Sequence, residues 1–260
     1  MLEFWFMLPI AILFASIAMA AGIGGAILFS PFLIVVLGFS PVEAIAAGLV
    51  IEMFGFSSGV FGYWRRRQID FSLVKSLVIF TLPATIIGVF ISHYVSAEIL
   101  QAALILLLLF LVWKFLGRKE YDTSGLRGEK IDGKCKSAAS FGAGLMGMIS
   151  SGLGEIDEYI FLDKLKLPPS IASGTSVMLV AVSAIVGVIT HAGYLISTNQ
   201  LSIIMQVSSV ILFAVPGVII GAQLGVYFVQ KISENKMRLF LGLLFSFLAV
   251  ILLLRVLGLF

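Results

Sequence analysis

Carboxylates inside apolar stretches are the residues of this sequence best placed to do chemistry. Glu52 lies near the centre of the apolar stretch from Pro41 to Tyr63. A charged side chain at the centre of a bilayer costs at least about 3 kcal/mol on insertion scales, so Glu52 must be protonated, paired or directed into a cavity. We predict that Glu52 carries protons; a structural hydrogen bond inside a helix bundle is the alternative.

Three further carboxylates follow a serine- and glycine-rich break in a second apolar stretch. Glu155 and Glu158 are three residues apart and share a helical face, while Asp157 points elsewhere. These groups could bind a cation or shuttle protons, or they could be solvated near the cytoplasm. His191, near the outer end of the stretch from Ser170 to Leu195, could relay protons or be a hydrogen-bonded interfacial histidine.

Glycine-rich breaks offer a second kind of chemistry. Gly22, Gly24 and Gly25 interrupt one apolar stretch, and Ser151, Gly152 and Gly154 interrupt another. Unwound backbone exposes N–H groups, and a helix that starts after such a break points its positive end toward the break, which suits an anion. The alternative is close helix packing through small residues. That alternative is our prediction for Gly217, Gly221 and Gly225, a stripe that makes a homodimer plausible.

The elements that carry these residues are transmembrane helices. The chain has 260 residues, of which 60% are hydrophobic and 12% charged, and its mean hydropathy is +1.13. Soluble domains carry about 25% charged residues, and a helix crosses a bilayer with about 20 apolar residues. We therefore predict an all-α polytopic membrane protein. With one cysteine, Cys135, a disulfide framework is excluded. We expect no metal, cofactor or nucleic-acid partner, because no such binding motif is present.

The positive charges predict the topology. Arg65–Arg67 with Lys75, the seven Lys and Arg from 114 to 136, Lys164 with Lys166, and the group at 231–238 alternate with connections at 38–43, 93–98 and 195–200 that contain none. The positive-inside rule then places the basic groups in the cytoplasm and the three connections outside. The central loop 117–137 is predicted inside and the amino terminus outside, in the plasma membrane.

One segment must enter the membrane and return if these charges are placed correctly, and a second segment has a similar break. The segment from Ala138 to Leu165 begins and ends beside cytoplasmic lysines and is broken at 150–154, where serines and glycines are poor helix formers. We predict a re-entrant or broken helical hairpin there. The same pattern over residues 5–37 predicts a second hairpin, with one long kinked helix as its alternative.

The two halves also resemble each other. Gly22-Ile23-Gly24 matches Gly152-Leu153-Gly154, and two later matches, 46–48 with 172–174 and 83–88 with 216–221, follow in the same order. A hairpin followed by three crossings reverses the orientation of the next half. We predict two inverted repeats, 1–116 and 138–260, joined by the cytoplasmic linker 117–137.

The glycine-rich 21–25 leading to Ser30-Pro31-Phe32-Leu33, its echo in the second half, and Ala172-Ser173-Gly174-Thr175-Ser176 together resemble the TauE/SafE family of membrane permeases. The resemblance covers nearly the whole chain. It implies export of a small anion such as sulfite or an organosulfonate, and adds Ser30, Thr175 and Ser176 to the glycines as candidate substrate-binding residues. The acidic run Glu155-Ile156-Asp157-Glu158 departs from the family pattern and leaves the charge of the substrate open.

These observations predict a secondary transporter of a small anion, coupled to protons and working by alternating access. An ion channel, or a transporter of a cationic substrate that uses the acidic hairpin, is the alternative. An enzyme built from Ser57 or Ser58 and His191 has weak support, because small serines also serve helix packing. The sequence leaves the substrate, coupling ion, direction of transport and oligomeric state undetermined.

Overall fold

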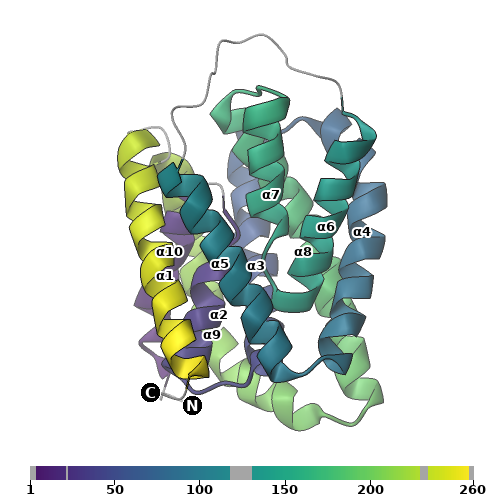
Figure 1. Ribbon diagram of the computed structural model, residues 1–260, viewed down its shortest axis with the longest axis vertical. Coiled ribbons are helices and arrows are strands. Elements are labelled where there is room, and N and C mark those ends of the chain that lie inside the picture. Colours follow the sequence, from purple (N-terminus) through teal and green to yellow (C-terminus); the bar gives the residue numbers. More distant parts are fainter. Residues whose placement is uncertain (1–3, 22, 118–130, 229–233, 258–260) are drawn as a thin grey trace.

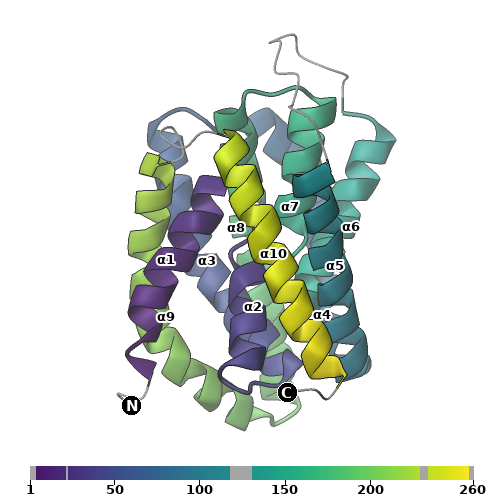
Figure 2. The same ribbon diagram turned by 60° about the vertical axis from the view of Figure 1, so that its left-hand side comes forward.

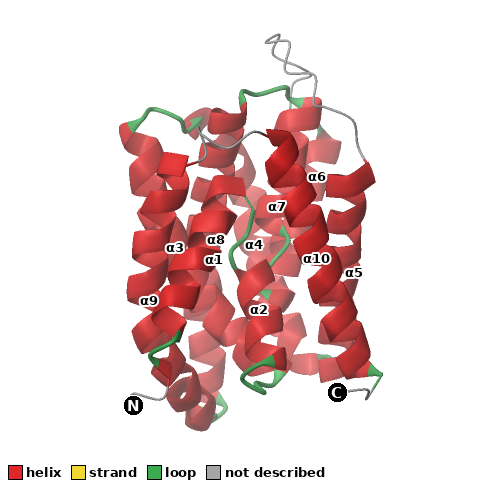
Figure 3. Ribbon diagram, turned by 90° about the vertical axis from the view of Figure 1, so that its left-hand side faces the viewer, coloured by secondary structure: helices red, strands yellow, loops and turns green. Residues whose placement is uncertain are grey.

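The structure, a computed structural model, describes residues 4–21, 23–117, 131–228 and 234–257. The described residues form helices joined by short connections, and none of them lies in a strand (Figure 3). Six helices are long and apolar enough to cross a membrane: α3 (Pro41–Arg65), α4 (Phe71–Tyr94), α5 (Ala97–Gly117), α8 (Pro169–Ser197), α9 (Leu201–Phe228) and α10 (Glu234–Val256). The predicted all-helical, polytopic fold is confirmed.

Local capping interactions define where the long helices begin. Ser40 and Glu43 form a reciprocal capping box at the start of α3, with Pro41 in its first turn, an arrangement that satisfies N–H groups without an intrahelical partner. The Asp70 side chain accepts hydrogen bonds from the N–H groups of Ser72 and Leu73 at the start of α4. Short polar connections in the sequence therefore encode the positions of these helices.

The amino-terminal segment is a hairpin of two short helices, α1 (Met7–Ala21) and α2 (Ala26–Val35). The ring of Phe14 on α1 lies 5.3 Å from that of Phe29 and 5.8 Å from that of Phe32. Such contacts require α2 to run back along α1. The structure thus contains the predicted hairpin and not the single kinked helix.

The second predicted hairpin consists of α6 (Gly133–Ile149) and α7 (Leu153–Tyr159), which continues into the π-helical turn η2 (Ile160–Lys164). The chain reverses where Ser150 has φ 57° and Gly152 has φ 127°. A φ of 127° is accessible to glycine and strained for other residues. The glycine at 152 therefore permits the reversal that the charges on either side require.

The two hairpins enter the bundle from opposite ends and meet within it. Figures 1 and 2 show α1 and α2 at the end where α10 terminates, and α6 and α7 at the opposite end, with both breaks inside the bundle. Helices α3 and α8 pack together at the centre. Around them, α1 packs on α9, α6 on α4, and α5 on α10.

Close glycine contacts join α9 to α1. A Cβ atom added to Gly225 would lie 2.7 Å from the Ser16 carbonyl oxygen, and one added to Gly217 would lie 2.7 Å from the Cβ of Ala11. The predicted close helix interface at Gly217, Gly221 and Gly225 is confirmed, since these glycines allow the two backbones to approach. Because the stripe is covered by α1 of the same chain, it gives no support to a homodimer, which stays an untested prediction.

Candidate functional site

The breaks of the two hairpins meet in the middle of the bundle. We call residues 23–25 the first tip and residues 150–154 the second tip. The N–H group of Gly24 donates a hydrogen bond to Oε1 of Glu155 at 3.1 Å, and the hydroxyls of Ser30 and Ser150 are 3.0 Å apart. A Cβ atom on Gly154 would lie 3.2 Å from the Gly24 nitrogen. The tips are therefore in contact, and glycine at 154 allows it.

Glu155 links the two tips through its carboxylate. While Oε1 accepts the hydrogen bond from Gly24, Oε2 accepts one from the N–H of Gly152 at 2.9 Å. The residue is fully buried. Hydrogen bonds of this kind, from backbone N–H groups to a carboxylate, are among the stronger ones in proteins. One side chain thus satisfies a donor on each hairpin.

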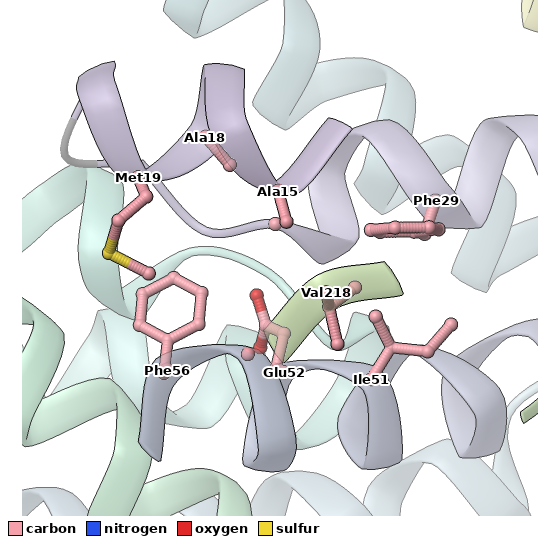
Figure 4. A pocket seen from close by; sticks show the side chains of 10 residues that line it. Ala15, Ala18, Met19, Phe29, Ile51, Glu52, Phe56 and Val218 are labelled. Atoms are coloured by element: carbon pink, nitrogen blue, oxygen red, sulfur yellow. The ribbon is translucent and has the colours of Figure 1, made fainter. Parts of the chain in front are cut away.

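Glu52 approaches the first tip from α3. Its Oε1 accepts a hydrogen bond from the N–H of Ala26, the first residue of α2, at 3.0 Å. The side chain is 2% exposed, and its Oε2 has no hydrogen-bond partner among the described residues. Figure 4 shows the carboxyl pointing from α3 toward α1 and α2, in a pocket walled by apolar side chains such as Met19, Phe29 and Phe56. The pocket has room for about one water molecule.

The two carboxylates converge on Gly24. A Cβ atom added to this glycine would lie 2.8 Å from Oε1 of Glu155 and 3.0 Å from Oε1 of Glu52. Only a residue without a side chain leaves space for both. The sequence predicted each carboxylate as a functional group, and the structure brings them together at one glycine.

The remaining predicted binding residues lie in different surroundings. The hydroxyl of Ser176 on α8 donates to the carbonyl of Gly154 at 3.2 Å, at the second tip. Thr175 instead accepts a hydrogen bond from the N–H of Asp70, at the start of α4. Ser151 is buried, and its hydroxyl has no partner among the described residues. Gly25 directly precedes α2, and Gly22 lies outside the described residues.

Lys114 is a charged neighbour of the tips, although the pattern of positive charges predicts it as one of the cytoplasmic group. It is 2% exposed, and its Nζ donates to the carbonyl of Glu155 at 2.8 Å. A lysine in the last turn of an apolar helix beside Trp113 is typical of an interfacial anchor. Nothing in the local pattern distinguishes a lysine that turns inward, so only the packing of α5 reveals it.

Asp157 and Glu158 are buried rather than solvated, with exposures of 0% and 7%. Both carboxyl oxygens of Asp157 are without a hydrogen-bond partner in the described part of the chain. Glu158 accepts a hydrogen bond from the Ser173 hydroxyl at 3.1 Å. The alternative that these two residues face a solvated vestibule is wrong for this conformation.

His191 lies apart from the tips, in the last two turns of α8. Its ring stacks on that of His93 with centroids 4.5 Å apart, and His93 stacks on Tyr194 at 3.7 Å. Both ring nitrogens of His191 are buried without a partner within the described residues. The hydrogen-bonded interfacial histidine considered above is therefore not what the structure contains.

The serine and histidine of the enzyme hypothesis are not joined. The Ser58 hydroxyl donates to the Ile219 carbonyl at 3.0 Å, and the Gln223 side chain donates to Ser58 at 2.9 Å. His191 has no hydrogen bond to any described residue. Nor do the described residues contain a group of three or more His, Cys, Asp or Glu side chains able to hold a metal ion.

A helical bundle with six apolar spans, in which two hairpins meet, has the architecture of a multi-pass membrane protein. The model of the family described as "Sulfite exporter TauE/SafE" matches residues 7–252, so the chain belongs to that family of transmembrane permeases.

Comparison with individual proteins gives a consistent result. The chain is 28% identical over 219 residues to the "Probable membrane transporter protein YjnA" of Bacillus subtilis (strain 168), covering 78% of this chain and 83% of that protein. No solved structure matches the chain.

Proposed function

We propose that the protein is a secondary transporter that moves a small anion of the sulfite or organosulfonate class across the cytoplasmic membrane by alternating access. The observation that carries this proposal is the meeting of the two hairpin tips. There the backbone N–H groups of Gly24 and Gly152 converge on one buried group of negative charge, the carboxylate of Glu155. Backbone N–H groups beside helix ends are suited to anions. The printed description of the family supports the same substrate class.

The anion site consists, in this proposal, of the two tips and their neighbours, and the buried titratable groups couple transport to protons. The hydroxyl of Thr175 accepts a hydrogen bond at the start of α4 rather than at the tips, so its assignment to the proposed site has the least support. The proposed substrate-binding residues are Gly22, Gly24, Gly25, Ser30, Ser151, Gly152, Gly154, Thr175 and Ser176. The proposed coupling residues are Glu52, Glu155, Asp157, Glu158 and His191.

Alternating access would follow from two inverted repeats, 1–116 and 138–260, with the linker 117–137 between them. The packing partners support such a relation, because α1 packs on α9 as α6 packs on α4, while α3 pairs with α8 and α5 with α10. Hairpins that enter from opposite ends have the arrangement expected of inverted-repeat transporters.

For the orientation, we propose a cytoplasmic linker and an external amino terminus. The basic turn at 65–67, the start of α6 and the end of η2 lie at one end of the bundle, and the connections without lysine or arginine lie at the other (Figure 1). Arg255, at the end of α10, is the exception, and it donates to the carbonyl of Ile34 in the last turn of α2. A cation is favourable at a helix carboxyl end, which gives Arg255 a structural reason for its place.

A cationic substrate is the second candidate, and a specific observation favours it. The carboxylates of Glu52 and Glu155 converge on Gly24, and Asp157 is buried nearby on α7. Buried carboxylates inside a membrane mark the routes of ions and protons. A channel could use the same groups without alternating access.

Counterflow in proteoliposomes tests these proposals. Vesicles are loaded with a sulfonate, sulfite, a carboxylate or a metal cation, and uptake of the labelled compound is followed at two pH values. We expect uptake of one of the sulfur oxyanions, accelerated by the same anion on the other side. Cation flux would favour the second candidate, and flux without acceleration would indicate a channel.

A further inference from the structure

The N–H groups of the proposed anion site are already occupied by the chain itself. Glu155 accepts from Gly24 at 3.1 Å and from Gly152 at 2.9 Å, with both of its oxygens engaged and no exposure to solvent. The carboxylate of Glu155 has the charge and the oxygen spacing of a small oxyanion. A transported anion that reached the same two donors would have to displace it.

Glu52 provides an independent indication that protons are exchanged at the hairpin tips. Its Oε2 is buried and without a partner among the described residues, beside a pocket with room for about one water molecule (Figure 4). A buried acceptor without a partner is costly. Protonation of the carboxyl group, or a water molecule that donates a hydrogen bond to Oε2, would remove this cost. A Cβ on Gly24 would lie 2.8 Å from Oε1 of Glu155 and 3.0 Å from Oε1 of Glu52, so these two oxygens are at most about 5.8 Å apart, a separation that one bridging water molecule can span.

The other charges around Glu155 come from few elements. Lys114 of α5 donates to its carbonyl, and Asp157 and Glu158 follow it on α7. Helices α1 and α2 carry no charged side chain, α6 is charged only in its first turn, and α8 contributes only His191 near its far end. Lys114 is therefore a cation in direct contact with the backbone of the residue that bears the carboxylate, whereas Lys164 of η2 lies nine positions further along the chain.

We propose that the Glu155 carboxylate is a built-in competitor of the transported anion. While ionised, it holds the N–H groups of Gly24 and Gly152. When it takes up a proton passed on by Glu52, which is then reprotonated from the solution, Glu155 releases both donors and an oxyanion binds in its place, near Lys114. This inference rests on the proposed anion transport. Its consequence is that one proton enters the site with each anion, so proton and anion move in the same direction.

The linkage between proton and anion sets the sign of the pH dependence. If binding of the anion requires uptake of one proton, its affinity rises as the pH falls, by roughly tenfold for each pH unit above the pKa of the group. A small alkyl sulfonate is the best probe because it stays ionised throughout the neutral range. Any pH dependence of its binding then belongs to the protein.

The test measures binding of a labelled alkyl sulfonate to the purified full-length protein between about pH 6 and 8, where linkage predicts the tenfold slope. Glu155→Gln replaces the carboxylate by a neutral group of the same shape. We expect this variant to bind the sulfonate independently of pH and at least about tenfold more tightly than the parent at the upper pH. Glu98→Gln, the same change at an exposed carboxylate on α5, should keep the slope of the parent.

Two further variants keep the result interpretable. Glu155→Gly gives the second tip the residue that Gly25 provides at the matching position of the first. This variant should also bind the sulfonate independently of pH, and it serves as the test if Glu155→Gln fails to fold. Glu52→Gln should slow exchange between the two sides and leave the slope of equilibrium binding in place.

The outcomes separate this inference from the proposed function. A parent protein that binds and exchanges sulfonate without a pH dependence, or a Glu155→Gln variant that keeps it, would overturn the competition and leave anion transport standing. A parent protein that neither binds nor exchanges any anion of the panel at either pH would overturn both.

Discussion

At the scale of single residues, the central feature is the pair of carboxylates directed at Gly24. Glu52 accepts a hydrogen bond from the first residue of α2, and Glu155 accepts hydrogen bonds from both tips. Glu52 accepts from one and Glu155 from two of the backbone N–H groups that the breaks in the helices leave without an intrahelical partner. The same residues that complete the fold therefore control access to the donors that we propose for the substrate.

Replacing Gly24 by alanine tests this arrangement. The added methyl group would lie 2.8 and 3.0 Å from the two carboxyl oxygens, and flexible carboxylates can move aside while the backbone stays in place. We expect Gly24→Ala to fold and to lose at least about tenfold in transport, equivalent to about 1.4 kcal/mol. Initial rates of uptake in proteoliposomes measure this loss.

Gly117→Ala is the matched control, because an added methyl would meet only the Trp113 ring at an ordinary distance of 3.6 Å. It should transport at the parental rate. Unchanged uptake by Gly24→Ala would mean that the two carboxylates need not stay on this glycine.

At the scale of elements, glycine serves two distinct purposes in this protein. In the hairpins it permits the reversal at 152 and the contact between the tips. In α9 it allows contact between α9 and α1, as Gly88 and Gly147 do for α4 and α6. Without a hydrophobic drive between helices in lipid, such close packing is a main source of association. Stability should therefore depend on the second group of glycines.

Gly225→Ala should lower stability by about 1–3 kcal/mol, the usual cost of overpacking. Its methyl group would lie 2.7 Å from both the Ser16 carbonyl oxygen and the Met19 Cβ. The melting temperature of the detergent-solubilised protein checks this expectation.

Gly193→Ala, in α8, is the control for this prediction. No atom lies within 4 Å of its added Cβ, so it should be neutral or stabilise the helix by about 0.5–1 kcal/mol. Equal melting temperatures for the two variants would show that the α1–α9 contact does not limit stability.

At the scale of the whole molecule, charge is distributed between two ends. The turns at 65–67 and the start of α6 carry lysine and arginine, while the connections at 38–43, 93–98 and 195–200 carry none. Such asymmetry orients helical membrane proteins. In the proposed orientation the hairpins enter from opposite sides of the membrane, which is the arrangement that the proposed alternating access would use.

Single cysteines placed at the two ends test the orientation. In a Cys135→Ser background, Thr198→Cys and Ser137→Cys put exposed thiols between α8 and α9 and near the start of α6. A membrane-impermeant maleimide should label Thr198→Cys in intact cells and Ser137→Cys only after the cells are permeabilised. The reverse pattern would mean that the bundle is inserted the other way round.

Much of this architecture can be predicted from the sequence alone, because its causes are local along the chain. Runs of apolar residues long enough to span a bilayer predict the six long helices. Glycine-rich breaks predict the two hairpins, and for the second hairpin the lysines at both of its ends give the same prediction. The burial of Glu52 follows from its place near the centre of an apolar stretch, whereas the sequence leaves open whether Glu155 and Asp157 are buried or solvated.

Only the tertiary structure decides which of these residues meet. Gly24 and Glu155 are 131 positions apart, and Lys114 and Glu155 are 41 apart. Hydropathy places each residue at a depth in the membrane but carries no information on which neighbour a helix presents it to. The inward turn of Lys114, the separation of Thr175 from the tips, and the use of the α9 glycines within the chain all depend on helix packing, which arises from contacts between distant segments.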